Sequence, residues 1–200
     1  MTFGTGKIEP DAGARQRLLA AALALFNEKG YAATSVRELV AAAGVTKPVL
    51  YYYFGNKEGI YLELMQSSSG TFESLVARIV SLDGSAQERI IHFCSDLFDI
   101  SVQRLALVRL MYAIYYGPPQ GAPPLDLEAY FVGMMELIQR LVRAGIAGGE
   151  LKEGSAEDVA RAIIAILTSA INDQLCPRES RLDREGMVRM LRLLMTGIAR

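Results

Sequence analysis

Residues 35–54 contain start and stop signals for two short helices, and these signals constrain the fold more than any other feature of the chain. The segment "SVRE" (35–38) has a serine three residues before a glutamate, which is the spacing of a capping box at a helix start. Gly44 ends this helix, because a sharp chain reversal needs a positive φ that glycine adopts easily. Thr46 then caps a second helix, and Pro48 falls in its first turn, where a missing N–H costs little. The segment is therefore predicted to be a helix–turn–helix.

Four aromatic residues in a row, "YYYF", follow Leu50 in the second of these helices. Successive side chains of a helix are rotated by about 100°, so the four rings cannot share one environment. Leu50 and Tyr53 are expected to point inward, and Phe54 is expected to pack against the following helix. Tyr51 and Tyr52 are expected on the outer face. Half of the aromatic run is thus predicted to be core, and half to be a contact surface.

Apolar residues recur at helical spacing along nearly the whole chain, so the predicted fold class is all-α. Besides the two short helices, the predicted helices cover residues 12–29, 57–82, 85–101, 103–116, 124–147, 155–175 and 183–198. The first of them is expected to pack across the two short helices, which alone cannot bury enough apolar surface. Strand signals are missing, since the chain has no sustained period-two alternation and no Asn-Gly hairpin turn.

The composition is that of an ordinary globular protein, with 51% apolar and 22% charged residues. The net charge of −1 does not by itself indicate nucleic-acid binding. The longest strongly apolar stretch, residues 159–171, is too short to span a bilayer and carries Arg161, so no membrane association is expected. The N-terminus lacks the apolar core of a signal peptide, which favours a cytoplasmic protein with reduced, buried cysteines.

Four segments follow one another within residues 17–64: "LFNEKGY", "TSVRELVAAAGV", "LYYYF" and "NKEGI". Together they resemble the DNA-binding region of the tetracycline-repressor-like (TetR) family of transcriptional regulators. The resemblance implies a three-helix helix–turn–helix DNA-binding domain at 1–56, a connecting helix at 57–82, and a larger helical ligand-binding and dimerisation domain at 83–200. Residues 65–200 match the family only in being all-helical and of the right length.

The resemblance also implies a function, which is that of a ligand-responsive transcriptional regulator. We expect a repressor that binds a palindromic operator in double-stranded DNA as a homodimer, and that a small-molecule inducer releases. In such a dimer each protomer presents its second short helix to the major groove. The effector alters the separation of the two DNA-binding domains. The identity of the effector is open, and an apolar or aromatic small molecule is the expectation. No cofactor and no metal site is expected.

Contacts with DNA are expected from both short helices and from the start of the next helix. The predicted phosphate contacts, which would position the domain, are Thr34, Ser35, Arg37, Tyr51 and Lys57. The predicted base-edge contacts, near the start of the recognition helix, are Thr46, Lys47, Pro48 and Tyr52. Simpler roles remain open: Ser35 as an N-cap alone, and Arg37 and Lys57 as solvated charges. Lys47 could instead be a non-specific phosphate contact.

The expected effector site is an apolar cavity with a few polar groups in the C-terminal domain. Its candidate residues are His92, Phe93, Asp96, Tyr112, Tyr115, Tyr116, Tyr130, Met134 and Asn172. Two alternatives stay open. A lone histidine on a helix of mixed polarity is more often structural than functional, and the aromatic residues of "MYAIYY" are more often core.

The last two helices are the expected dimer-forming elements, arranged with their copies as a four-helix interface about a two-fold axis. Small and β-branched residues in "DVARAIIAILTSAINDQL" allow helices to approach closely, and "MVRMLRLLMTGI" has an apolar stripe between arginines. The predicted interface residues are Ala162, Ile163, Ile166, Ser169, Ala170, Met187, Met190, Leu191, Leu194 and Ile198. The alternative is packing of the same residues inside one chain.

Three other classes of function fit the sequence less well. An enzyme would need a nucleophile–base pair, a metal set or a glycine-rich phosphate loop, and the chain has one histidine, two cysteines and none of these motifs. A thiol-based redox sensor would have to use Cys94 or Cys176, and neither lies in an electropositive motif that would activate the thiol. A purely structural helical protein would leave the helix–turn–helix unexplained.

Overall fold

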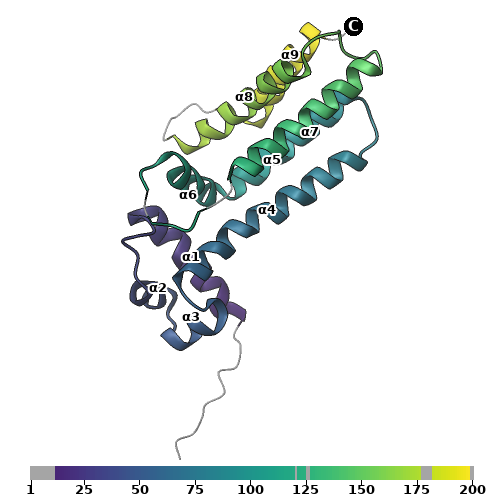
Figure 1. The fold of residues 1–200 in the computed structure, drawn as a ribbon. Helices are drawn as coiled ribbons and strands as arrows, with labels where there is room; N and C mark the ends of the chain where they lie inside the picture. The colour runs from purple at the N-terminus through teal and green to yellow at the C-terminus, as the bar shows by residue number, and fades with distance from the viewer. Residues whose placement is uncertain (1–11, 120, 125–126, 177–181, 199–200) are drawn as a thin grey trace, which may run out of the picture. The chain divides into compact units, whose positions relative to one another are not determined.

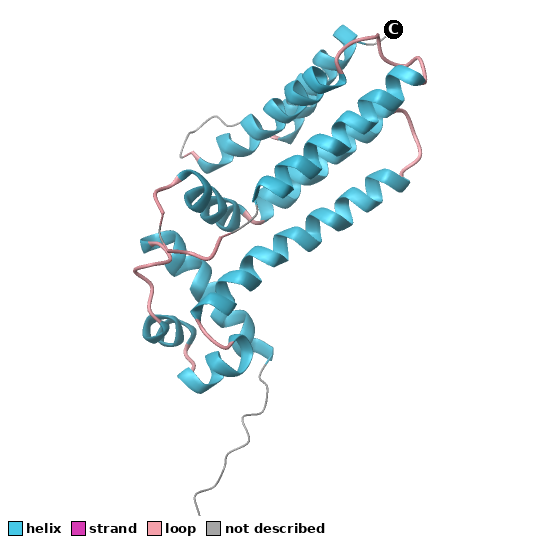
Figure 2. Cartoon of the chain, in the orientation of Figure 1, coloured by secondary structure: helices cyan, strands magenta, loops and turns pink. Residues whose placement is uncertain are grey.

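The computed structural model describes residues 12–119, 121–124, 127–176 and 182–198. The regular elements in these residues are α-helices, which confirms the all-α prediction (Figure 1; Figure 2). In chain order they are α1 (Ala12–Lys29), α2 (Val36–Ala43), α3 (Lys47–Phe54), α4 (Lys57–Ser81), α5 (Ala86–Gln103), α6 (Leu105–Tyr116), α7 (Leu127–Ala147), α8 (Ala156–Leu175) and α9 (Arg184–Ile198). Within the described ranges, every helix is too short or too polar to cross a bilayer.

Local capping explains why the predicted helix ends agree with the observed ones to within a few residues. The Ser35 hydroxyl accepts a hydrogen bond from the Glu38 amide at 3.3 Å, and Glu38 Oε2 accepts one from the Ser35 amide at 2.8 Å. Gly44 ends α2 with φ 61°, in the left-handed region that the predicted turn requires. At the start of α4, Asn56 Oδ1 accepts a hydrogen bond from the Gly59 amide at 2.8 Å. These bonds satisfy backbone groups that a helix end leaves unpaired.

The described residues divide into two compact units, and the boundary between them runs through α4. Unit 1 comprises those of residues 1–67 and 106–125, and unit 2 comprises those of residues 68–105 and 126–200. The boundaries of these units differ from the predicted domain boundaries, because unit 1 includes the start of α4 and nearly all of α6. The predicted domain boundaries stay a prediction.

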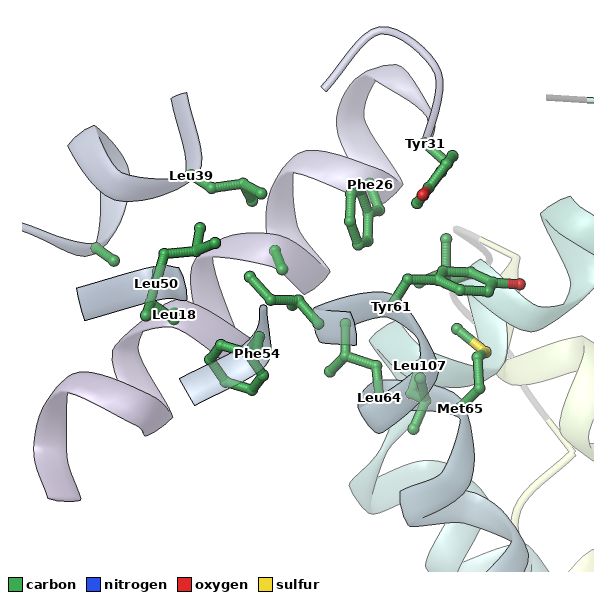
Figure 3. Packing of buried hydrophobic residues seen from close by; sticks show 14 of the residues in the cluster. Leu18, Phe26, Tyr31, Leu39, Leu50, Phe54, Tyr61, Leu64, Met65 and Leu107 are labelled. Carbon is green, nitrogen blue, oxygen red and sulfur yellow. The ribbon is translucent and has the colours of Figure 1, made fainter. Parts of the chain in front are cut away.

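Unit 1 is held together by one apolar core to which α1, α2, α3, α4 and α6 contribute. As expected, α1 packs against both α2 and α3, and Leu39 of α2 and Leu50 of α3 are fully buried there (Figure 3). Beside them the rings of Phe26, Tyr31 and Tyr61 form an aromatic cluster, with centroid separations of 5.4, 6.3 and 5.2 Å. The core therefore joins the helix–turn–helix to the first turns of α4.

Unit 2 is a bundle of α5, α7, α8 and α9 together with the second part of α4. In Figure 1, α7 lies beside α5, and α8 and α9 lie alongside each other. The interior is largely aliphatic and includes the fully buried Ile138 of α7, Ile163 of α8 and Leu191 of α9. A glycine permits one close helix contact, because a Cβ at Gly145 of α7 would lie 2.8 Å from the Cβ of Ala86 at the start of α5.

Candidate nucleic-acid interface

The recognition helix α3 separates its side chains into an inner and an outer face, much as its sequence predicts. Leu50 is fully buried, and Phe54 is only 9% exposed. On the outer face, Tyr51 and Tyr52 are 50% and 59% exposed. Tyr53 is half-buried rather than fully inward, and its ring centroid lies 5.0 Å from that of Tyr52. The outer face of α3 therefore presents two tyrosines that the core does not hold.

Thr46, Lys47 and Pro48 are exposed at the start of α3, as a base-reading role requires. Thr46 has the extended backbone of an N-cap (φ −101°, ψ 159°), but its side chain makes no capping hydrogen bond. Pro48 stands in the first turn, where the lack of an N–H is tolerated. A hydroxyl, an ammonium group and an apolar ring are thus displayed together. These are groups that hydrogen-bond to base edges or touch a thymine methyl.

Gly59, which the sequence pattern did not single out, shapes the corner after α3. It lies in the first turn of α4, so close to the end of α3 that an added Cβ would be 1.9 Å from the carbonyl oxygen of Phe54. Only a residue without a side chain fits there, so this contact determines how α3 meets the start of α4. The second glycine of "FGNKEG" was the available signal, and it is compatible with a turn without revealing a close contact.

At the start of α2, Ser35 and its neighbours are engaged within the chain. The Ser35 hydroxyl donates to Glu38 Oε2 at 2.7 Å, in addition to its capping bond. Glu38 also forms an ion pair with Lys29, and hydrogen bonds from Lys29 and from Ser35 lower the pKa of Glu38 to about 2. Arg37, by contrast, is exposed. The N-cap role of Ser35 is confirmed, and phosphate contacts by Ser35 and Arg37 stay predictions.

Thr34 and Lys57 are engaged inside unit 1. Thr34 is 1% exposed, and its hydroxyl donates to the Gly30 carbonyl at 2.8 Å. This burial corrects the prediction of a phosphate contact at Thr34, because DNA could not reach the hydroxyl while the surrounding helices stay packed. Lys57 Nζ donates to the carbonyls of Tyr31 and Thr34, at 2.9 Å in each case. Burial lowers the pKa of Lys57.

In unit 2, two of the predicted effector residues meet around Phe72 of α4. The centroid of the Phe72 ring lies 4.3 Å from that of Tyr130 and 6.3 Å from that of Phe93. Met134, one turn after Tyr130 on α7, is buried. In the sequence Phe72 is only one apolar position of a helix, since spacing within α4 cannot show that the ring meets α5 and α7. The cluster identifies Phe72 as an effector candidate.

Other predicted effector residues lie elsewhere. His92 and Asn172 are exposed, and Asp96 forms an ion pair with Arg78. Three further candidates, Tyr112, Tyr115 and Tyr116, lie on α6 in unit 1 rather than with Phe93 in unit 2. Surface positions do not fit a buried effector site, so the structure gives no support to a role for His92 or Asn172.

The predicted dimer residues on α8 and α9 divide between an inner and an outer face. Four are fully buried inside unit 2, which corrects the interface prediction at Ile163, Ala170, Met187 and Leu191. A side chain enclosed by its own chain cannot contact a partner. The rest are exposed or half-buried: Ala162, Ile166, Ser169, Met190, Leu194 and Ile198. The sequence pattern missed Leu193, which is 76% exposed, because the strongest apolar spacing of α9 belongs to its inner face.

The buried thiol of Cys94 argues against the redox-sensor alternative. Cys94 is fully buried in α5, and burial raises the pKa of its thiol to about 12, so the reactive thiolate is scarce at neutral pH. Cys176 is half-buried at the end of α8. In the part of the chain that the structure describes, no cluster of three or more His, Cys, Asp or Glu side chains could hold a metal ion.

The helix–turn–helix matches one family of known proteins. A family model described as "Bacterial regulatory proteins, tetR family" matches residues 18–64, from α1 into the start of α4. The transcriptional regulator AcuR of Cereibacter sphaeroides is 34% identical over 148 residues, which cover 71% of this chain and 67% of that protein. The fatty acid metabolism regulator protein of Bacillus subtilis is 26% identical over 166 residues, which cover 79% of this chain and 84% of that protein.

The fold is shared with a solved regulator over nearly its full length. The structure of the ketosteroid transcriptional regulator KstR2 of Mycobacterium tuberculosis has a TM-score of 0.73 and 21% sequence identity, covering 98% of each chain. These similar proteins are transcriptional regulators, not enzymes. The sequence match over the helix–turn–helix, the similarity that extends beyond it and the shared fold show that the chain belongs to the TetR family of bacterial transcriptional regulators.

Proposed function

We propose that this TetR-family regulator is a cytoplasmic repressor, which binds a palindromic DNA operator as a homodimer and is released by a small-molecule inducer. The observation that carries the DNA-binding part is the outer face of α3, where Thr46, Lys47, Pro48, Tyr51 and Tyr52 are exposed together. The opposite face of the same helix is core. A short helix with one anchored face and one polar, aromatic face suits insertion into a major groove.

Each exposed residue of α3 has a proposed part in the complex. Lys47 donates to guanine N7 and O6, and Thr46 and Pro48 contact thymine methyl groups. Tyr51 bonds to a phosphate, and Tyr52 reaches into the groove. Contacts to phosphates position the helix and contacts to base edges specify the sequence, so these residues divide between the two tasks.

The dimer is proposed to form through the outer faces of α8 and α9. Met190 and Leu193 are 43% and 76% exposed on α9, and Ala165 and Ser169 are exposed on α8. Exposed apolar and small side chains can be covered by the same surface of a second copy, in an isologous contact. In the DNA-competent dimer the two α3 helices lie about one helical turn of DNA apart, ~34 Å.

The effector is proposed to bind in unit 2 beside Phe72, Phe93 and Tyr130, whose aromatic rings suit an apolar or aromatic ligand. A ligand shifts the balance between two states only by binding one of them better. A coupling of about 1–3 kcal/mol would change operator affinity roughly 5–150-fold. Because α4 contributes residues to both units, it is the proposed path of this coupling. The name of the Bacillus subtilis relative makes fatty acids the first compounds to test.

Selection of bound duplexes from a random pool tests the DNA-binding proposal. We expect a two-fold symmetric site whose half-sites lie about one helical turn or a multiple of it apart. Affinity for this site should fall steeply with salt, because Lys and Arg release counterions from phosphates on binding. An affinity that does not change between low and moderate salt, or a selected pool without any symmetric site, would refute the proposal.

A titration with candidate effectors tests the induction proposal on the selected operator. An effector should reduce operator affinity within the roughly 5–150-fold range given above. Phe72→Ala should keep operator binding and lose the response, whereas His92→Ala, at an exposed position of α5, is the control and should respond as the unaltered protein does. If the Phe72→Ala protein still responds fully, the proposed effector position is wrong.

A further inference from the structure

We propose that Lys57 is a positioning residue, which holds the chain before α2 in place from inside unit 1 and makes no phosphate contact. Together with Arg17 at the other end, Lys57 clamps α2 between α4 and α1. The effect on operator affinity rests on the proposed DNA binding, whereas the clamp itself consists of contacts within unit 1.

The ammonium group of Lys57 has three partners in the turn that leads into α2. It donates to the carbonyl oxygens of Tyr31 and Thr34, both at 2.9 Å, and lies 4.1 Å from the centroid of the Tyr31 ring. An ammonium group has three N–H donors, and the face of an aromatic ring attracts a cation. Moving this group to a phosphate would break all three contacts at once.

Arg17 of α1 makes the corresponding contact at the other end of α2. Its Nε donates to the carbonyl of Ala43, the last residue of α2, at 3.1 Å. The last carbonyls of a helix lack partners within the helix, and a cation there also interacts favourably with the helix dipole. The two ends of α2 are therefore each held by a cation from a different helix.

The basic residues of α1 to α4 differ in what they contact. Lys57 and Arg17 bond to backbone carbonyls, and Lys29 pairs with Glu38. Lys47 and Arg37 are exposed, as the predicted DNA contacts require. Since α2 and α3 are joined only by a short turn and share one core, a shift of α2 would displace α3 as well. The clamp therefore acts on DNA recognition through the placement of α3.

The salt dependence of operator binding distinguishes Lys57 from a cation that contacts a phosphate. Arg37→Met, at an exposed position with a predicted phosphate contact, should reduce the slope of log affinity against log salt by about 1, the loss expected when one cation no longer contacts a phosphate. Lys57→Met should weaken binding at every salt concentration and leave the slope as in the unaltered protein. A slope reduced by about 1 in Lys57→Met would overturn the proposal and make Lys57 a phosphate contact.

Amide hydrogen exchange of the DNA-free protein tests the clamp directly. Lys57→Met should speed exchange at the amides of Glu38 and Leu39, which bond to Ser35 in the first turn of α2. Arg17→Met should do so at the amide of Gly44, which bonds to the Ala41 carbonyl, while Lys47→Met should change neither. Circular dichroism establishes that each variant is helical. Lys57→Gln, which keeps an NH2 donor group but no charge, carries the same two measurements if the methionine variant does not fold. Unchanged exchange in a folded Lys57 variant would overturn the clamp. If the Lys57 variant exchanges faster but the unaltered protein binds no operator, the clamp is supported and the proposed function is refuted.

Discussion

Two helices, α3 in the helix–turn–helix and α9 in unit 2, each bury one face and display another, but they display different chemistry. The outer face of α3 carries Lys47, Tyr51 and Tyr52, whereas the outer face of α9 carries Met190 and Leu193. Hydrogen-bonding and charged groups suit a polar partner such as a DNA groove. Exposing apolar side chains to water costs free energy, so these side chains suit a second apolar surface. The inner faces of both helices are alike, so the outer faces carry the functional difference.

The largest expected effect tests whether the inner faces of α3 and α9 are both part of a core. Leu50→Ala in α3 and Leu191→Ala in α9 should each reduce the free energy of unfolding by about 2–5 kcal/mol, because both side chains are fully buried. Chemical denaturation monitored by circular dichroism measures this. A loss well below 1 kcal/mol for either variant would show that its inner face is not core.

A charge on the outer face of α9 tests the proposed dimer. Leu193→Asp should leave the helices folded but weaken self-association by at least about 2 kcal/mol, or roughly 30-fold, because a central interface residue would become a buried charge. Sedimentation velocity across a concentration series measures the change. The unaltered protein is the reference. Association of Leu193→Asp as strong as that of the unaltered protein would exclude Leu193 from the interface.

Two glycines of α4 can be compared: Gly59, at the corner with α3, and Gly70, further along the same helix. Gly59→Ala should destabilise unit 1 by about 1–3 kcal/mol and impair operator binding, because its Cβ would overlap the Phe54 carbonyl oxygen. Gly70→Ala has open space around the new Cβ and should stabilise α4 by up to about 1 kcal/mol. Thermal unfolding compares the two. If both variants are equally stable, the close contact at Gly59 does not constrain the corner.

A smaller effect concerns Tyr52, one of the two outer tyrosines of α3. Tyr52→Phe removes one exposed hydroxyl, so the fold should be unchanged, and operator affinity should fall by about 0.5–1.5 kcal/mol if the hydroxyl bonds to DNA. Fluorescence anisotropy with the selected operator and a random duplex measures both affinities. An unchanged operator affinity would leave Tyr52 as a packing contact only.

The smallest expected effect is a pH dependence that differs between the capping boxes of the two units. Hydrogen bonds from Lys29 and Ser35 lower the pKa of Glu38 to about 2, and those from Ser85 lower the pKa of Glu88. A lowered folded-state pKa contributes stability above the ordinary carboxyl pKa near 4.5, and this contribution is lost as pH falls towards 2. The stability difference between the unaltered protein and Glu38→Gln should therefore narrow over that range. Denaturation midpoints of both glutamine variants, Glu38→Gln and Glu88→Gln, are measured at several pH values. They would show whether the ion pair of Glu38 with Lys29 makes the stability contribution of Glu38 more dependent on pH than that of Glu88.

The helix–turn–helix could be predicted closely because its signals are local. The Ser35–Glu38 capping box and the turn at Gly44 involve residues at most a few positions apart, and a helix rotates its side chains by a constant angle. The inner and outer faces of α3 follow from that rotation. In α9 the same argument finds an apolar stripe but cannot say whether the stripe meets its own chain or a partner, and Met187 and Leu191 proved to be internal.

The sequence by itself determined the helices, their ends and the outward face of α3, since these depend on neighbours along the chain. The tertiary structure decided the partners of the polar and glycine residues around them. Lys57 meets Tyr31 across a separation of 26 residues, and Arg17 meets Ala43 across the same separation. A lysine or an arginine has the same hydrogen-bonding groups whether it binds a phosphate or a carbonyl. Only the packing of α1, α2 and α4 brings the carbonyls to these cations and thereby settles which group each one contacts in the folded chain.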